Sequence, residues 1–413
     1  MTELALAAKT VRSSSVSPMR AESACAPMVT KRHYLRKISL TQFRSYGSAS
    51  LELDGRPVTL TGENGAGKTN ILEALSILGP GRGLRNARIN ELASLDGDGS
   101  WAISARLNQG DDECVIGVGT TSDAPDRRQC RINGQSASGP GEFADLIRFV
   151  WLTPAQDRLF MEGASERRRF FDRMIAVHDT GFRKAANAYE QAMRQRQKLL
   201  EVGNSDDRWL QALEQQMAEY GVAIADARRT MAVTLAAQNV AGDDGLFPAA
   251  DIALEGDVEV ALVNFAAGDV EDDFADKLKK GRGLDREAGR TLYGPHRSDL
   301  MVGHRPKGRP ARLCSTGEQK ALLIGLVLAN AKALAAKRTA PSFMSDRADN
   351  APLVLLLDEI AAHLDEERRS RLFDILDELG FSVFMTGTDY SLFSAWQDRA
   401  QHLKVHDGGV YPV

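Results

Sequence analysis

The sequence is poor in cysteine, with 4 in 413 residues: Cys25, Cys114, Cys130 and Cys314. None of them stands in a Cys-x-x-Cys pair, and the spacing that is typical of zinc sites is absent. The scarcity argues against a disulfide framework and favours reduced thiols in a cytoplasmic protein.

Long apolar runs and an excess of positive charge are lacking as well. No apolar run approaches the length needed to cross a bilayer, so we expect no membrane partner. The formal net charge is −4 and the sequence pI is about 6.1. Any contact with nucleic acid must therefore come from local basic patches, because a global positive field is excluded. A chain of 413 residues is long enough for two domains or for one large domain with an insertion. The 43% of hydrophobic residues supports a well-packed core.

The first 32 residues differ from the rest. They are rich in Ser and Ala, without clear periodicity, and a targeting peptide is one interpretation. Glu3 and Glu22, together with the lack of a long apolar stretch, favour two others. One is a disordered N-terminal extension over 1–32, and the other is a true translation start at Met28.

Strand patterns and helix patterns alternate along the remaining chain. Residues 34–53 alternate apolar and polar positions and break near Gly47, which predicts two strands joined by a turn. Asn133-Gly134 is a dipeptide typical of hairpin turns. After 164 the pattern turns helical, and strand–helix alternation returns after about 290.

The order of these patterns predicts an α/β layer, a helical insertion and then more of the same α/β layer. We expect one α/β lobe from 33–155 and 291–413, with a compact helical second domain over 156–290. Four residues of that helical segment recur at near-helical spacing and predict a buried stripe: Trp209, Leu213, Met217 and Ile224.

A glycine-rich loop lies between a predicted strand and a predicted helix, with the sequence TGENGAGKTN over 61–70. It fits the pattern G-x-x-x-x-G-K-[ST], whose backbone N–H groups point at phosphate oxygens. In this interpretation Lys68 reaches the β- and γ-phosphates, and the Thr69 hydroxyl binds Mg²⁺. The candidate ATP-binding residues of the loop are Gly62, Glu63, Asn64, Gly65, Ala66, Gly67, Lys68, Thr69 and Asn70.

Two acids follow a continuous apolar run, PLVLLL, that is typical of a strand buried on both faces. Asp358 at its end is the second candidate Mg²⁺ ligand. Glu359 is the candidate general base that activates the attacking water, and with Lys68 it forms the predicted catalytic pair.

A second anion site is predicted before the apolar helix that begins CSTGEQKALLIGL. Ser315 and Glu318 have the spacing of a capping box, which is a structural role. The Ser315 hydroxyl and the N–H groups at the helix start can also hold an anion. Because this stretch lies far along the chain from Lys68, two subunits placed head to tail could sandwich one ATP.

These motifs, together with AAHLD at 361–365, resemble an ABC-type ATPase head. Three further stretches, LTQFRSYGSASLEL, SERRRFFDR and LYGPHRSDL, are similar to hallmarks of the RecF family, and the resemblance covers 34–413. It implies a Rad50-like head with mixed sheets and a compact helical domain that lacks the long coiled coil. It also implies that Ser315, Gly317, Gln319 and Asp365 contact ATP.

The resemblance further implies a function in DNA repair and replication, including the response to DNA damage. A RecF-like protein dimerises on double-stranded or gapped DNA when it binds ATP, hydrolyses ATP slowly, and works with RecR and RecO to load RecA. The usual ABC switch histidine is replaced by Thr388, which predicts slow turnover. Gln156 stands where a Q-loop glutamine belongs, although RecF-like chains vary there.

Arginine-rich stretches are the candidate DNA contacts, because arginine binds phosphate without sequence preference. Similar arginines follow the ATPase helix in RecF-like proteins, so the first stretch, with Arg82, Arg85 and Arg88, is the preferred surface. For a single cluster the alternative is a solvated face or an ion-pair network. His296 and Arg297 could equally serve a function or a loop structure.

Other functions are open on sequence alone. A transporter ATPase subunit shares the phosphate loop and the signature but usually keeps the switch histidine. A Rad50 or SMC head would need a coiled coil of several hundred residues between its lobes. A scaffold that binds ATP without turnover is a further alternative; the pair Asp358 and Glu359 favours hydrolysis, and an assay decides between the two.

Overall fold

The computed structural model describes residues 33–110, 112–203, 206–238, 246–339 and 351–413. For 338 and 339 only the backbone is described. The predicted N-terminal extension, with the alternative start at Met28, lies outside the described residues.

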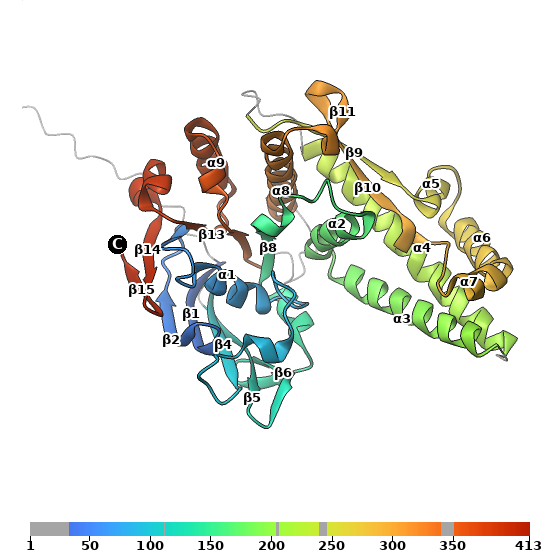
Figure 1. Ribbon diagram of the computed structural model, residues 1–413, viewed down its shortest axis with the longest axis horizontal. Coiled ribbons are helices and arrows are strands. Elements are labelled where there is room, and N and C mark those ends of the chain that lie inside the picture. The colour runs from blue at the N-terminus through green and yellow to red at the C-terminus, as the bar shows by residue number, and fades with distance from the viewer. Residues whose placement is uncertain (1–32, 111, 204–205, 239–245, 340–350) are drawn as a thin grey trace, which may run out of the picture. The chain divides into compact units, whose positions relative to one another are not determined.

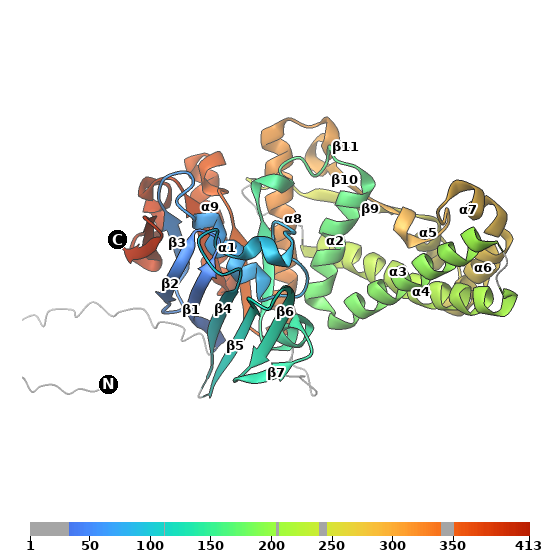
Figure 2. The same cartoon turned by 60° about the horizontal axis from the view of Figure 1, so that its bottom comes forward.

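An antiparallel sheet, sheet A, is formed by the first part of the described chain, with strand order β2-β1-β4-β5-β6-β7 (Figure 2). Its strands are β1 (His33–Phe43), β2 (Tyr46–Glu52), β4 (Trp101–Gln109), β5 (Asp112–Thr121), β6 (Ala124–Ile132) and β7 (Gln135–Ala137). The two strands expected from residues 34–53 are confirmed as β1 and β2, and the turn that joins them falls at Arg44, which has φ 53°, three residues before Gly47. The predicted hairpin at Asn133-Gly134 is confirmed, since Ile132 pairs with Gln135 and both turn residues have positive φ.

The second six-stranded sheet, sheet B, has the order β15-β14-β3-β13-β12-β8. Every pair in it is parallel except β14 with β15. Its strands are β3 (Val58–Thr61), β8 (Arg148–Leu152), β12 (Leu353–Leu357), β13 (Ser382–Gly387), β14 (Gln401–His406) and β15 (Gly409–Pro412). Strands from both ends of the described chain thus share one sheet, while the domain boundaries given above stay a prediction.

Both faces of sheet B are covered, which explains why β12 and β13 are apolar throughout. Successive residues of β12 alternate between two hydrophobic cores: Val354 and Leu356 pack with sheet A, and Leu353 and Leu355 pack with the helices. The helix α1 (Lys68–Ile77) belongs to the core on the sheet A side. Its first turn therefore begins at the carboxyl end of β3, where parallel strands place their binding sites.

The second hydrophobic core lies between sheet B and the helices on its other face. It contains residues of α2 (Ala164–His178), α8 (Thr316–Thr339) and α9 (Glu366–Leu379) and continues into the helical segment. That segment has α3 (Thr180–Val202), α4 (Asp207–Gln238), α5 (Asp257–Asn264), α6 (Ala267–Lys280) and α7 (Arg282–Ala288). The long helices α3 and α4 pack against each other (Figure 1). The α/β class with mixed sheets and helices is confirmed.

The predicted apolar stripe on α4 is only partly correct. Leu213, Met217 and Ile224 are buried, whereas the side chain of Trp209 is 57% exposed. Leu210 takes its place in the core at 6% exposure. Consecutive side chains of an α-helix point in directions about 100° apart, so a shift of one residue is enough to exchange a buried position for an exposed one.

A three-stranded antiparallel sheet, β11-β10-β9, joins the helical segment to α8. Its strands are β9 (Ala250–Glu255), β10 (Asp299–His304) and β11 (Arg309–Pro310). His296 precedes β10, with Nε2 2.9 Å from the Thr291 carbonyl and Nδ1 2.8 Å from Tyr189 Oη. Because a carbonyl only accepts, Nε2 is the donor, and burial lowers the pKa of His296. The histidine therefore ties this loop to α3, which is a structural role.

One helix meets the length and composition of a membrane span. Residues 316–337 of α8 have a mean hydropathy of 1.3 in their most apolar window, so the expectation that no run approaches that length is wrong. Of that window, 78% is buried inside the protein. The helix is apolar because it packs on all sides within the core.

Candidate nucleotide-binding site

The phosphate loop depends on three glycines with positive φ: Gly62 at 149°, Gly65 at 85° and Gly67 at 106°. A Cβ on Gly62 would lie 2.3 Å from the Val405 carbonyl oxygen, so no side chain fits there. A Cβ on Gly65 would meet nothing within 4 Å. The loop is thus closed toward the sheet and open toward solvent.

Free N–H groups line the loop at the start of α1. In the described part of the chain, the backbone N–H groups of Gly65, Gly67, Lys68 and Thr69 donate to no protein atom. A helix leaves its first N–H groups unpaired, and its dipole favours negative charge at that end. The cradle therefore fits a phosphate group.

Lys68 closes the loop from within. Its Nζ donates to the carbonyls of Gly62 and Glu63, at 2.7 Å each, and the residue is 5% exposed. Burial lowers the pKa of Lys68, and the negative charges of Glu359 and Asp358 oppose that shift. Their charges thus favour the ammonium form of Lys68, which can exchange its carbonyl partners for phosphate oxygens.

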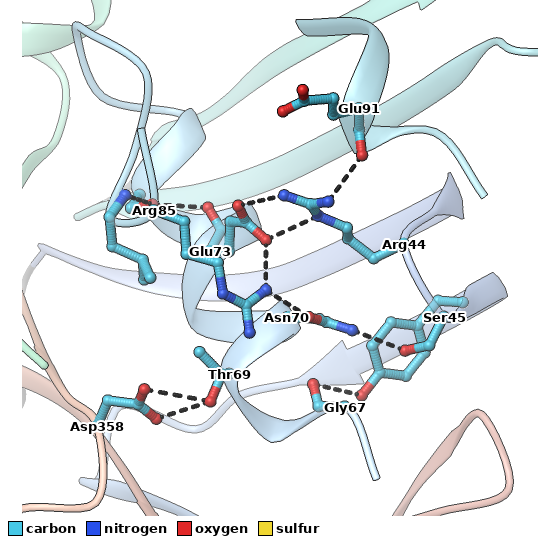
Figure 3. Close-up of polar contacts among 12 residues, drawn as sticks. Arg44, Ser45, Gly67, Thr69, Asn70, Glu73, Arg85, Glu91 and Asp358 are labelled. Atoms are coloured by element: carbon cyan, nitrogen blue, oxygen red, sulfur yellow. Dashed lines mark hydrogen bonds and ion pairs between the residues drawn. The ribbon is translucent and has the colours of Figure 1, made fainter. Parts of the chain in front are cut away.

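Asp358 lies directly beside the loop, at the end of β12. The Thr69 hydroxyl donates to its two carboxylate oxygens at 3.0 and 3.1 Å (Figure 3). The Thr386 hydroxyl, on the neighbouring strand β13, donates to the same carboxylate at 2.8 Å. The two residues predicted to bind Mg²⁺, which are 289 positions apart, are therefore in contact.

Glu359 follows with a backbone conformation that is uncommon for a residue with a side chain, φ 54°. Its N–H donates to Thr386 Oγ1 at 2.8 Å, so one hydroxyl holds both acids in place. Within the described residues its carboxylate accepts no hydrogen bond from protein, and it is half-buried. A carboxylate left open in this way can accept a proton from water.

The turn between β1 and β2 supports the loop from the sheet A side. The Tyr46 hydroxyl donates to the Gly67 carbonyl at 3.0 Å, and Asn70 Nδ2 donates to Ser45 Oγ at 2.9 Å (Figure 3). Tyr46 is fully buried, and burial raises the pKa of its hydroxyl. A Cβ on Gly67 would lie 2.7 Å from Tyr46 Oη, so this contact requires glycine.

A buried carboxylate on α1 holds Arg85. Glu73 is 0% exposed and accepts from Arg85 Nη1 at 2.8 Å and from Arg44 at 2.9 and 2.8 Å (Figure 3). Arg85 Nη1 also donates to Asn70 Oδ1 at 2.7 Å. One of the three candidate DNA-binding arginines is therefore committed to the ATPase helix.

Arg82 and Arg88 are exposed, as Arg85 is, but unlike Arg85 neither forms an ion pair with a described residue. The other arginine-rich stretches make internal contacts. Arg128 donates to carbonyls at and after the end of α1, Arg167 pairs with Asp299 at 2.6 Å, and Lys307 and Arg309 pair with Glu318.

The signature stretch has the expected capping box. The Ser315 N–H donates to Glu318 Oε2 at 2.9 Å, and the Glu318 N–H donates to Ser315 Oγ at 3.4 Å. The ion pair with Lys307, helped by the Ser315 N–H, lowers the pKa of Glu318 to about 2. Ser315 and Gly317 are exposed, while Gln319 is buried and donates to the Cys314 carbonyl at 2.9 Å.

The loop after β8 reaches both the acids and the signature helix. The Asp358 N–H donates to the Leu152 carbonyl, so the strand ends lie side by side. Gln156 follows, and its Oε1 accepts from the Thr153 N–H at 2.9 Å. The next residue, Asp157, pairs with Lys320 of α8 at 2.9 Å, and Lys320 is 7% exposed.

The two remaining candidates lie at helix and strand ends. Asp365 is the N-cap of α9, accepting from the Arg368 N–H at 2.8 Å. Thr388 is exposed directly after β13. In the described chain no hydrogen bond joins either of them, or Ser315, to the phosphate loop.

The structure thus brings together the phosphate loop, Asp358 and Glu359, and leaves the signature stretch separate. Sequence reasoning missed Thr386, whose hydroxyl lies in the apolar run FSVFMTG and is 0% exposed. A lone hydroxyl in a strand buried on both faces was the signal that could have found it, because such groups need a partner.

The residues present fit ATP with Mg²⁺. Hydroxyl and carboxylate oxygens are ligands that Mg²⁺ prefers, and Thr69 and Asp358 supply one of each. Mg²⁺ in nucleotide sites takes one or two protein ligands and fills the rest with phosphates and water. In the parts of the chain described above, no group of three or more His, Cys, Asp or Glu gathers.

Comparison with known proteins gives a consistent result. The family model for the RecF/RecN/SMC N terminal domain matches residues 34–408. A protein of Mesorhizobium japonicum described as DNA replication and repair protein RecF is 49% identical, covering 92% of this chain and 98% of its own. A protein of Brucella suis with the same description is 50% identical, covering 91% of this chain and 95% of its own.

Solved structures show the same fold. The recombination mediator protein RecF with ATP, described as part of the RecFOR pathway, superimposes with a TM-score of 0.78 at 24% identity. It covers 94% of this chain and 100% of its own. An SMC head domain from Pyrococcus furiosus with an extended coiled coil reaches a TM-score of 0.50 at 18% identity, covering 92% and 96%. The ABC-type, Rad50-like head expected from the motifs is thus the observed fold class.

Proposed function

The chain belongs to the RecF family, and from this membership we propose that it is a DNA-binding ATPase that acts in the recombinational repair of gaps and stalled forks. The observation that carries the proposal is the assembled site, in which Thr69 contacts Asp358 and the neighbouring Glu359 carboxylate accepts no hydrogen bond from a described residue. The transporter alternative has no support in relatives that are described as DNA repair proteins.

ATP binds in the phosphate loop, with its phosphates on the free N–H groups and on Lys68. Thr69 and Asp358 would hold Mg²⁺, which would supply positive charge to neutralise the phosphates. Glu359 orients the water and accepts its proton. Thr388 stands at the position of the usual switch histidine. A histidine there would provide a second proton carrier, whereas threonine provides only a hydroxyl, and turnover is therefore slow.

Two copies sandwich ATP head to tail. Ser315 is exposed, and no hydrogen bond between described residues joins it to the phosphate loop of its own copy. Its hydroxyl and the N–H groups at the start of α8 are suited to phosphate. A second copy supplies them to the bound triphosphate. ATP binding thereby drives dimerisation, and hydrolysis releases it.

Ser315→Arg tests this arrangement. The variant is expected to bind ATP with wild-type affinity and to remain monomeric, because the larger cation would fill the space of the partner's phosphate. Calorimetry gives the affinity, and light scattering with and without ATP gives the mass. Ser136→Arg, an exposed serine on β7, is the control and should dimerise. An ATP-dependent dimer of Ser315→Arg would refute the head-to-tail sandwich.

DNA binds to the exposed arginines after α1. Arg82 and Arg88 form no ion pair with described residues, and the buried Glu73 fixes Arg85 between them. The network of Figure 3 thus connects Asn70, next to the Mg²⁺ ligand Thr69, with the surface that carries these arginines. In the dimer two such surfaces combine on duplex or gapped DNA.

Arg82→Ala combined with Arg88→Ala is expected to weaken DNA binding. The slope of log affinity against log salt should fall by about 1 for each phosphate that the variant no longer neutralises. Arg85 is kept, because its removal would deprive the buried Glu73 of a partner. Arg194→Ala, an exposed arginine on α3, is the control. An unchanged slope in fluorescence anisotropy would show that DNA binds elsewhere.

We propose further that the protein works with RecR and RecO to load RecA, in the cytoplasm. The support is the pathway named for the solved RecF structures and the RecF description of the relatives.

A further inference from the structure

Thr386 is the last side chain of β13 before Gly387. Successive residues of β13 alternate between the two hydrophobic cores: Met385 packs with the helices, and Phe384 packs in the core that contains α1. Thr386 therefore points to the side of the sheet that holds α1 and the phosphate loop. It is 0% exposed. A buried hydroxyl is costly unless it is hydrogen-bonded, so its partners define its role.

Both partners of the Thr386 hydroxyl belong to the pair of acids after β12. The Glu359 N–H lies 2.8 Å from Thr386 Oγ1, and a backbone N–H can only donate. The single proton of the hydroxyl is then left for Asp358 Oδ1, which is also 2.8 Å away. The hydroxyl thus accepts from the backbone of one acid and donates to the carboxylate of the other, so its orientation is fixed from both sides.

Glu359 needs this support because of its backbone. Its φ of 54° lies in the left-handed region, which is disfavoured for a residue with a Cβ. Ile360, which follows, already has helical angles, with φ −70° and ψ −40°. Among the described residues, the Glu359 N–H donates to Thr386 alone. The direction in which the Glu359 carboxylate leaves the chain is therefore set where Thr386 binds.

Asp358 is held by two hydroxyls that differ in kind. Thr69 donates to both of its carboxylate oxygens from α1, and Thr386 donates to Oδ1 from β13. Thr69 is itself the other candidate Mg²⁺ ligand, whereas Thr386 lies outside that pair. Groups that bond to a metal ligand without binding the metal fix the orientation of that ligand.

We propose that Thr386 is a positioning residue for ATP hydrolysis, whose hydroxyl holds the Mg²⁺ ligand Asp358 and the general base Glu359 in a fixed relation to each other. Because one oxygen serves both acids, its loss affects the metal site and the base together. This inference rests on the proposed ATP hydrolysis and deepens it, since Thr386 acts only through the two acids.

Thr386→Val tests the inference, because it removes the hydroxyl and keeps the branched shape. The rate of ATP hydrolysis at saturating Mg²⁺ is expected to fall about 10–100-fold. The Mg²⁺ concentration that half-saturates ATP binding should rise about 10-fold or more, which calorimetry measures without turnover. The affinity for ATP in EDTA should be unchanged, because Lys68 and the loop N–H groups are held without Thr386.

Thr59→Val is the matched control. Thr59 is a 0% exposed threonine of the neighbouring strand β3, and its hydroxyl bonds to His402 Nδ1 at 2.7 Å. Both valine variants should lower the unfolding temperature to a similar extent, because each loses a buried, hydrogen-bonded hydroxyl. Thr59→Val should keep the wild-type rate and Mg²⁺ requirement.

Two further variants of Thr386 separate the hydroxyl from the packing. Thr386→Ser restores the hydroxyl and should recover most of the rate. Thr386→Ala removes the hydroxyl without placing a methyl group against Asp358, so it carries the test if the valine variant does not fold, with the same losses expected.

The inference is overturned if the folded valine or alanine variant keeps the wild-type rate and Mg²⁺ requirement. It is also overturned if Thr386→Ser is as slow as Thr386→Val, or if Thr59→Val loses as much activity. A wild type that binds ATP with Mg²⁺ but does not hydrolyse it would instead refute the proposed function.

Discussion

Lys68→Met is expected to weaken ATP binding strongly, raising the Kd for ATP by roughly 10²–10⁴-fold. In the free protein the ammonium group donates to two loop carbonyls at 2.7 Å, and ATP would replace these with phosphate oxygens. Hydrogen bonds to a charged group contribute about 1.5–3 kcal/mol each, so the loss of two accounts for that range. Methionine keeps the length of the side chain without the donor. Isothermal titration with ATP measures the change.

The control for this variant is Lys277→Met, a lysine of α6 whose side chain is 45% exposed and pairs with Asp273. It should bind ATP as the wild type does. Lys68→Met should also stay monomeric with ATP, because no triphosphate is present to be sandwiched. Wild-type affinity in Lys68→Met would place the triphosphate outside the glycine loop.

Glu359→Gln is expected to slow ATP hydrolysis by about 10²–10⁴-fold, the usual contribution of a general base. The amide keeps the shape and the backbone bond to Thr386, so ATP affinity should change little. Dimers formed with ATP should then persist, since hydrolysis no longer separates them. Phosphate release under single-turnover conditions measures the rate, and light scattering over time measures the lifetime of the dimer.

Glu366→Gln is the matched control, an exposed acid in the first turn of α9, further along the same chain segment. It should hydrolyse ATP at the wild-type rate. If Glu359→Gln retained full activity, another group would have to accept the proton. Asp358 would be a poor substitute, because its carboxylate already accepts from two hydroxyls.

The local chemistry of the site was predictable from the sequence. A glycine loop with a fixed spacing has few conformations that leave its N–H groups free, so Gly62 to Thr69 defined the phosphate cradle. The apolar run before Asp358 indicated a strand buried on both faces, and such strands place their last residues at one edge of a sheet. The contact of Thr69 with Asp358 follows from these two facts.

Contacts that depend on tertiary packing were not predictable. Nothing in the spacing of Arg85 distinguishes it from Arg82, yet it reaches a buried Glu73 and its neighbours do not. The Thr386 hydroxyl gains its role only when β13 pairs with β12. The turn expected near Gly47 falls three residues earlier, at Arg44, because Phe43 and Tyr46 form the last pair between β1 and β2.

The ion pair between Asp157 and Lys320 has a thermodynamic consequence. It joins the loop after β8 to the second turn of α8, the helix that begins after Ser315. In the proposed ATP-dependent dimer, this ion pair would link occupancy of the phosphate loop to affinity for a second copy. Linkage is reciprocal. The factor by which ATP raises the association constant of the dimer equals the factor by which dimerisation raises the affinity for ATP.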